Sequence, residues 1–568
     1  ADALELLEKH RPFASAAERA AGGRIVRRLG GFALAVELVA AWLLTHPGST
    51  YAQIVEGLGL GDLEQIAASD DVELRRHNHQ RRLSAVLSPV LHRLRPAERR
   101  TMEYAALLPP DQVPLPWLKT LVVAEFRELA QPGRRSDPWD DLCGRLARLA
   151  LFTRSGSLEA DWRIVCIHRL VQDVLCSQMP AKELAARQKA VVELVKARDA
   201  ALEATTRWEQ ARWELEPLEG LAVLWADADY AGASWLLNQV GQRWRAVAEW
   251  TRAEPLIRRA LAIDEQSLGS EHSNVAIRLC SLAALLQATN RLGEAEPLLR
   301  RALAIDEQSY GHEHPHVARD LNNLALLLKA TNRRAEAESL LRRALVIDEH
   351  AYGPEHPDVA KSLNNLAQLL KATNRLGEAE PLMRRALAID EQSYGTEHPD
   401  VARDLNNLAA LLQATNRLGE AEPLMRRALA IDEQSYGTEH PEVAIRLNTL
   451  AQLLQNTNRP KEAEPLMRRV LAIFRKSLGE DHPNVATALN NLARLLQATN
   501  RLAEAEPLMR SMLEILLQFT RVAGHPHPHL QSAIWNYSGL LSQMGRSEAE
   551  VSAQLKTLAH LYGLSFGD

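Results

Sequence analysis

Cysteines, aromatic residues and long hydrophobic runs are all scarce in this chain of 568 residues. Its four cysteines have no paired spacing, which indicates free thiols in a reducing cytoplasm and not a disulfide framework. The longest apolar stretch, residues 32–44, is interrupted by Glu37 and is too short to cross a bilayer. No signal peptide opens the sequence. We therefore expect a cytoplasmic protein without a membrane contact.

The chain also lacks a basic excess and a phosphate-binding loop. Its net charge of −5 and pI near 6.5 do not favour binding to nucleic acid. The pattern Gly-x-x-x-x-Gly-Lys-Ser/Thr is missing, and the pair Gly-Lys occurs nowhere, so tight nucleotide binding and hydrolysis are not expected here. No Ser/His/Asp, Cys/His or paired-carboxylate arrangement can be singled out from linear spacing. We expect no catalytic residues and no enzyme activity from this chain.

What the sequence does contain is a period of 42 residues. His-Pro recurs at residues 314, 356, 398, 440 and 482, and Leu-Asn-Asn-Leu-Ala recurs at 321, 363 and 405. A fixed period of this size predicts a solenoid of stacked helix pairs. In one repeat, Leu321, Leu324, Ala325 and Leu328 form a single apolar stripe on the first helix. Residues 232–568 therefore predict about eight helix pairs, the last of them a terminal cap.

Polar residues repeat on the opposite side of the first helix. At about 100° per residue, Arg319 and Asn323 lie nearly opposite the apolar stripe, and Asn322 lies on its flank. Carboxamides have donors and an acceptor, so a ladder of them could pair with the backbone of an extended ligand. Alternatively, they bond to neighbouring helices and hold the superhelical pitch. The candidate ligand-binding asparagines are Asn323, Asn365, Asn407 and Asn491, in a series interrupted by Thr449, together with Asn322, Asn364 and Asn406.

Basic residues recur at two further positions of the first helices. A basic lining in an acidic protein favours an acidic ligand, although a solvated face is the alternative. On the second helix, pairs such as Glu338 and Arg342 are expected to be solvated and without a further role. The histidine clusters 312/314/316 and 525/527/529 lack the cysteines or carboxylates typical of zinc sites, so no metal is expected. The candidate cations are Arg319, Lys361 and Arg403 at one position and Lys329 and Lys371 at the other.

The motifs LNNLA, EAEPLxRRAL and GxEHPxVA resemble tetratricopeptide repeats, in particular the 42-residue repeats of kinesin light chains and many bacterial signalling proteins. The resemblance covers residues 232–555. It implies an all-α, right-handed superhelix whose concave face, lined by the first helices, binds a protein or peptide.

The N-terminal third has a different pattern. Residues 1–79 predict a helical domain, residues 80–180 predict helices with one small β-hairpin as in a winged helix, and residues 181–231 predict a helical connector. The hairpin joins 151–154 to 162–167.

Two short motifs in this part resemble those of NB-ARC/STAND ATPases. GGFALA at residues 30–35 is similar to their Gly-Leu-Pro-Leu-Ala motif, with Ala33 in place of the proline. IHRLVQ at 167–172 is similar to the segment that contains their Met-His-Asp motif. The resemblance implies that His168 senses nucleotide through the β-phosphate of ADP. The alternative role for His168 is a hydrogen bond at a strand–helix junction.

The chain begins at Ala1 within helix-like sequence, so we interpret it as part of a longer protein with an ATPase and an effector upstream. The predicted function is ligand sensing in a bacterial STAND protein of antiphage defence or signalling. A protein or acidic peptide in the groove would control nucleotide-dependent self-association, with ATP or ADP and Mg held outside this chain. A constitutive scaffold and a winged-helix DNA-binding regulator are the alternatives.

Overall fold

The computed structural model describes residues 2–28, 90–130, 137–154, 163–203, 211–523 and 525–564, with isolated residues between 36 and 87. The chain divides into two compact units. Unit 1 comprises Ala1–Ala201 and Glu216–Ala228, and unit 2 comprises Leu202–Leu215 and Asp229–Asp568. The motif at 30–35, with Ala33, lies outside the described residues, as do most of the helices predicted within 32–94.

Helices make up most of the described residues between 2 and 227. The predicted helices at the start of the chain and around a Pro-rich loop are present, with boundaries shifted by a few residues. Their bounds are α1 Asp2–His10, α2 Ala16–Arg28, α6 Pro96–Ala105, α7 Leu115–Val123, η1 Arg127–Ala130, α8 Pro138–Arg148, α9 Arg169–Gln178, α10 Ala181–Glu203, η2 Arg212–Glu214 and α12 Leu215–Asp227.

The predicted hairpin is present, and a third strand extends it. Strand β2 (Thr153–Arg154) pairs antiparallel with β3 (Ile164–Cys166), and β1 (Val113–Pro114) pairs with the other edge of β3. The sequence predicts only a loop at β1 because of its prolines. Pro114 is accommodated because β1 is an edge strand, where a missing N–H leaves no ladder bond unmade.

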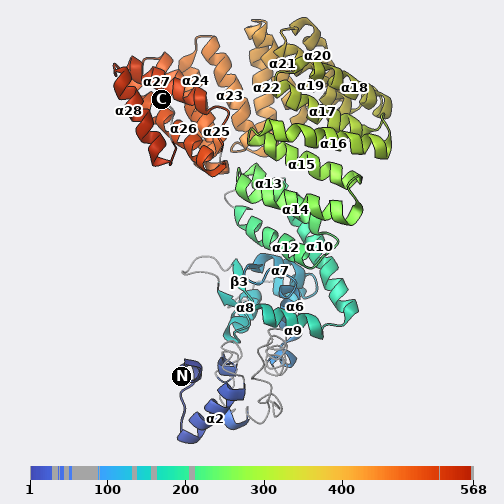
Figure 1. The fold of residues 1–568 in the computed structure, drawn as a ribbon, viewed down its shortest axis with the longest axis vertical. Helices are drawn as coiled ribbons and strands as arrows, with labels where there is room; N and C mark the ends of the chain where they lie inside the picture. Colours follow the sequence, from blue (N-terminus) through green and yellow to red (C-terminus); the bar gives the residue numbers. More distant parts are fainter. Residues whose placement is uncertain are drawn as a thin grey trace. The chain divides into compact units, whose positions relative to one another are not determined.

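Unit 2 is a series of antiparallel helix pairs, stacked one after another from α13 to α28 (Figure 1). This arrangement confirms the predicted all-α repeat fold. Residues 233–561, all of which are described except Gly524, form eight helix pairs. The first helices are α13 Ala233–Ala246, α15 Ser273–Ala288, α17 Pro315–Ala330, α19 Pro357–Ala372, α21 Pro399–Ala414, α23 Pro441–Asn456, α25 Pro483–Ala498 and α27 Leu530–Gln543. The second helices are α14 Trp250–Leu268, α16 Leu292–Tyr310, α18 Arg334–Tyr352, α20 Leu376–Tyr394, α22 Leu418–Tyr436, α24 Pro460–Leu478, α26 Leu502–Ala523 and α28 Glu548–Leu561.

Two short turns, repeated along the chain, set the geometry of each pair. Inside a pair, Asn332 adopts φ +63°, a left-handed conformation that asparagine tolerates better than most residues, and its counterparts do the same. Between pairs, Gly353 has φ +87°, which only glycine adopts without strain. His356 then caps α19 by accepting the backbone N–H of Asp358 at Nδ1 over 3.2 Å.

The apolar stripe lies where the sequence predicts it. Leu321, Leu324, Ala325 and Leu328 of α17 are all at most 1% exposed. Leu321 packs with Ala344 and Ile347 of α18 in one core cluster, and the small alanine lets the two helices approach closely. Each pair thus has its own core, which continues into the next pair and leaves the opposite side of the first helices for other contacts.

Candidate functional site

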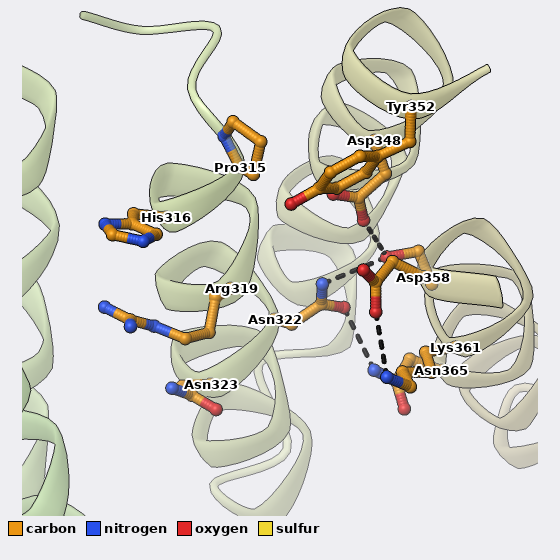
Figure 2. Close-up of a pocket in the computed structure, with 11 residues that line it drawn as sticks. Pro315, His316, Arg319, Asn322, Asn323, Asp348, Tyr352, Asp358, Lys361 and Asn365 are labelled. Atoms are coloured by element: carbon orange, nitrogen blue, oxygen red, sulfur yellow. Dashed lines mark hydrogen bonds and ion pairs between the residues drawn. The ribbon is translucent and has the colours of Figure 1, made fainter. Parts of the chain in front are cut away.

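A pocket of about 360 Å³ opens on the groove face, by which we mean the side of the first helices that bears Arg319, Asn323 and their counterparts (Figure 2). The pocket lies between α17, α18 and α19, so two consecutive repeats build it. Its volume is in the range typical of ligand pockets. It is lined by Pro315, His316, Arg319, Asn322, Asn323, Asp348, Tyr352, Asp358, Lys361, Ser362 and Asn365.

A chain of hydrogen bonds crosses the floor of this pocket. Asn365 Nδ2 donates to Asn322 Oδ1 over 3.0 Å, and Asn322 Nδ2 donates to Ser362 Oγ over 3.1 Å. Ser362 in turn donates to Asp348 Oδ2 over 2.6 Å. Figure 2 shows these bonds joining the three helices. The amides therefore tie each repeat to the next.

The same amide contact recurs along the solenoid. Asn407 donates to Asn364 Oδ1 over 3.4 Å, and Asn364 donates to the buried carboxylate of Asp404 over 2.7 Å. The contact is missing at Asn406, whose Oδ1 is buried without a hydrogen-bond partner. The residue that should reach it is Thr449, whose hydroxyl donates instead to the carbonyl of Ile445. Further along, Asn491 donates to Asn448 and Asn536 donates to Asn490.

These contacts bear on the asparagines predicted to bind a ligand. For Asn365, Asn407 and Asn491, the hydrogen bonds are those of the alternative role, in which amides hold neighbouring repeats together. Asn323 lines the pocket, and the residue that it faces one repeat earlier, at the position equivalent to Asn322, is Cys280 and not an asparagine. Ligand contact by these side chains stays a prediction.

The predicted cations at the first groove position all have acidic partners. Arg319 Nη2 lies 3.0 Å from both Asp306 Oδ2 and Asp320 Oδ1. Lys361 pairs with Asp358 over 2.8 Å. Arg403 repeats the arrangement of Arg319, with Asp390 at 3.2 Å, Asp404 at 3.3 Å and Asp400 at 2.6 Å. The charge of these three cations is therefore largely neutralised by carboxylates.

Three buried carboxylates, which are not among the residues predicted from the sequence, dominate the electrostatics of the site. Burial raises the pKa of Asp348 to about 6, although the hydrogen bond from Ser362 acts to lower it. Burial, opposed by Arg319, raises the pKa of Asp320 to about 6. Burial, opposed by Arg403, raises the pKa of Asp404 to about 7. For Asp348, an available signal was the aspartate that recurs every 42 residues in the second helices, in the motif AIDEQS or, in this repeat, VIDEHA.

Lys329 and Lys371 differ from the other cations. Each is partly buried near the end of its first helix, and neither forms an ion pair among residues 211–564 as described. Burial lowers the pKa of both, and the charge of Lys329 further lowers the pKa of Lys371. Two neighbouring cations that lack a protein carboxylate are the positions best suited to an anionic ligand group.

The expectation that Glu338 and Arg342 have no further role is wrong. Glu338 accepts from Arg342 on its own helix and from Arg375 of the next repeat over 2.7 Å. Arg375 also pairs with Glu378 over 2.6 Å. The same bridge recurs at Arg291, Arg333, Arg417, Arg459 and Arg501. Single-helix spacing cannot reveal this ladder because its second arginine comes from the following repeat.

The repeated histidines act as helix caps. His314, His356, His398 and His440 each accept a backbone N–H at Nδ1, and each ring stacks on a tyrosine of the preceding helix, with centroids 4.3–4.5 Å apart. In the described part of the chain, no group of three or more His, Cys, Asp or Glu side chains is arranged to hold a metal ion.

In unit 1, His168 caps α9 by accepting the N–H of Leu170 at Nδ1 over 3.2 Å. This is the strand–helix hydrogen bond considered as the alternative to nucleotide sensing. An imidazole whose Nδ1 accepts has its hydrogen on Nε2 when neutral, so the cap fixes the tautomer.

Helix pairs stacked at a constant period, with a polar face along the first helices, define a helical-repeat binding protein. Six overlapping stretches match the tetratricopeptide repeat profile: residues 232–308, 279–350, 321–392, 374–434, 405–476 and 447–518. They cover half of the chain, so the chain belongs to the tetratricopeptide repeat family. Such repeats generally mediate protein–protein interactions.

Several solved structures are similar to this chain. TPR-like repeats of a kinesin light chain from Podosopora anserina are 30% identical, over 36% of this chain and 96% of that one, with a TM-score of 0.31. BtubC from P. vanneervenii is 24% identical, over 40% of this chain and 89% of that one, with a TM-score of 0.33. A Signal Transduction ATPase with Numerous Domains (STAND) protein with a tetratricopeptide repeat sensor, from Pyrococcus horikoshii, is 14% identical, over 99% of this chain and 71% of that one, with a TM-score of 0.50.

No curated protein sequence matches the chain. Among the described residues, no helix is both long enough and apolar enough to span a membrane.

Proposed function

We propose that the solenoid is the ligand-sensing arm of a STAND-type signalling protein. The observation that supports this is the fold likeness to a STAND protein with a tetratricopeptide repeat sensor, which extends over 99% of the chain and so includes unit 1. In this proposal a protein or peptide segment binds the groove face. The helices and sheet of unit 1 act as a winged helix and transmit the event to a nucleotide-binding core in a longer protein.

The electrostatics of the groove face support an acidic ligand segment. Among the five candidate cations, Lys329 and Lys371 are the two with no carboxylate partner in the described part of the chain, whereas Arg319 and Arg403 pair with buried aspartates. A ligand carboxylate near the two lysines would relieve their mutual repulsion and raise their pKa. We therefore narrow the predicted contact to this lysine pair.

His168 would couple unit 1 to the nucleotide. ATP or ADP with Mg would be bound by a core outside this chain, since the sequence has no phosphate-binding loop of its own. The cap at Leu170 holds the imidazole with Nε2 as its donor, the form that can hydrogen bond to a phosphate oxygen. Replacement of His168 by Asn would keep a capping acceptor and remove this donor.

The groove can be tested with a defined probe. A labelled twelve-residue peptide rich in Glu is titrated against the full chain, beside the same peptide with Gln in place of Glu. We expect the Glu peptide to bind more tightly, and Lys329→Ala with Lys371→Ala to weaken it by about tenfold. The control is Arg342→Ala, which removes a more exposed cation from the second helix. Equal binding of both peptides would exclude an acidic ligand segment.

The switch itself needs the longer protein with its ATPase. Deletion of residues 232–568 should remove ligand control of nucleotide-dependent self-association, measured by light scattering with ATP and with ADP. Identical assembly with and without the solenoid would instead identify the repeats as a constitutive scaffold.

A further inference from the structure

The first and seventh helix pairs touch each other. Trp250, at the start of α14, packs edge-to-face on Phe519 near the end of α26, with ring centroids 4.8 Å apart and planes at 72°. Phe519 is only 5% exposed. Helices so distant in sequence meet here in addition to the contacts that each pair makes with its neighbours.

Trp250 and Phe519 both differ from the residues at the equivalent positions of the other repeats. The position of Trp250 is Leu in most other second helices, for example Leu376 and Leu418. The position of Phe519 is Ser in most of them, and Ser393 and Ser435 are exposed. Two large aromatic side chains therefore replace smaller ones where the two helices meet, which indicates a specific contact and not an accident of the repeat.

An irregular spacing in the repeats lies next to the same contact. Helix α26 has 22 residues where the preceding second helices have 19, and the connection after it is longer. That connection returns to Phe519, because the rings of His525 and His527 lie 5.9 Å and 4.7 Å from it. The N–H of His527 also donates to Thr520 Oγ1 over 3.3 Å.

We propose that Trp250 and Phe519 form a latch that holds the first and seventh helix pairs together and limits how far the groove face can open. The latch can open without unfolding the repeats, because each helix pair keeps its own core. The indole Nε1 of Trp250 is buried without a hydrogen-bond partner, so opening would let water satisfy it and offset part of the lost contact. This inference concerns the solenoid alone and does not depend on the proposed signalling role.

The latch is tested in the full chain with Trp250→Leu and Phe519→Ser, which introduce residues that the other repeats already tolerate at these positions. We expect a larger radius of gyration by X-ray scattering in both variants. Amide exchange should accelerate about tenfold at the start of α14 and the end of α26 and stay unchanged in α17–α22. The double variant should match either single one, because each change alone breaks the contact.

The control is Trp535→Leu, which removes a tryptophan that is 76% exposed on α27. An unchanged radius with native helical content would overturn the latch. Faster exchange throughout the repeats would overturn it as well, since it would identify the contact as ordinary core packing.

Discussion

Asn365 donates its side-chain amide to Asn322 over 3.0 Å, across the boundary between two helix pairs. The bond lies at the floor of the groove pocket, so the same residues could bind a ligand or hold the two helix pairs together. Substitution separates the two roles.

We expect Asn322→Ala to destabilise the solenoid by about 1–3 kcal/mol, because it leaves the amide of Asn365 and the hydroxyl of Ser362 each short of one partner. The matched control is Asn323→Ala, one position along the same helix, which should cost less than about 0.5 kcal/mol. Urea unfolding followed by circular dichroism gives both values. If the two substitutions had the same effect, the amide ladder would not be a source of stability.

The sequence predicts the period, the apolar stripes and the polar side of each first helix, because these depend on residues within one helix. It does not predict the partners of Arg319 and Arg403, since Asp306 and Asp390 come from the preceding second helix and their approach depends on how the pairs stack. The contact between Trp250 and Phe519 is even harder to predict from the sequence, because it depends on the curvature that accumulates over seven helix pairs.

The predictions for single residues are limited in the same way. An angular projection places Asn365 on the groove face, but it cannot show that the amide is already bonded to Asn322. The repeated histidines invite a metal hypothesis until their backbone contacts are seen, and a cap requires only one acceptor nitrogen.

The cap of α25 predicts a loss of stability in acid. His482 Nδ1 accepts the N–H of Asn484 over 3.0 Å, and burial lowers the pKa of His482 to about 4. This pKa lies below the value of about 6.5 that a histidine has in the unfolded chain. The neutral cap therefore stabilises the folded state fully above about pH 6.5, and this stabilisation is lost as the pH falls toward 4. The free energy of unfolding should fall by at most about 1.4 kcal/mol for each pH unit through this one group.

His482→Asn keeps a capping oxygen and removes the titration. The stability of the parent relative to this variant should therefore fall between pH 6.5 and pH 4, as measured by urea unfolding at several pH values. A difference that is constant over this range would contradict the assignment of His482 as a neutral cap.

The pair Asp390 and Asp404 predicts the opposite pH dependence. Both carboxylates contact Arg403, Asp404 also accepts from Asn364, and Asp400 lies on the other side of the guanidinium. Burial raises the pKa of Asp404 to about 7. The protonated form therefore stabilises the fold below the unfolded pKa of about 4, and this contribution is lost as the pH rises through 7.

Asp404→Asn should then stabilise the protein at pH 8 by roughly 1 kcal/mol or more and have little effect at pH 4. The asparagine Oδ1 can still accept from Asn364, and its amide can donate toward Asp390, whose Oδ1 has no partner. Asp400→Asn is the control, because it removes a more exposed carboxylate from the same arginine, and we expect no gain from it. Equal gains at both pH values would show that the charge of Asp404 is not the cause.

The gap in the amide ladder gives a prediction of increased stability. Asn406 Oδ1 is buried without a partner because residue 449 is Thr, whose hydroxyl donates to Ile445. Thr449→Asn would supply the missing donor, as Asn491 does for Asn448 over 2.9 Å. We expect a gain of about 1 kcal/mol, since helix propensities of Asn and Thr are similar and the new bond satisfies a buried acceptor. Urea unfolding and amide exchange in α21 and α23 would measure it. The gain should vanish when Thr449→Asn is combined with Asn406→Ala, because the acceptor is then absent, and an equal gain in that background would mean that the ladder is not its source.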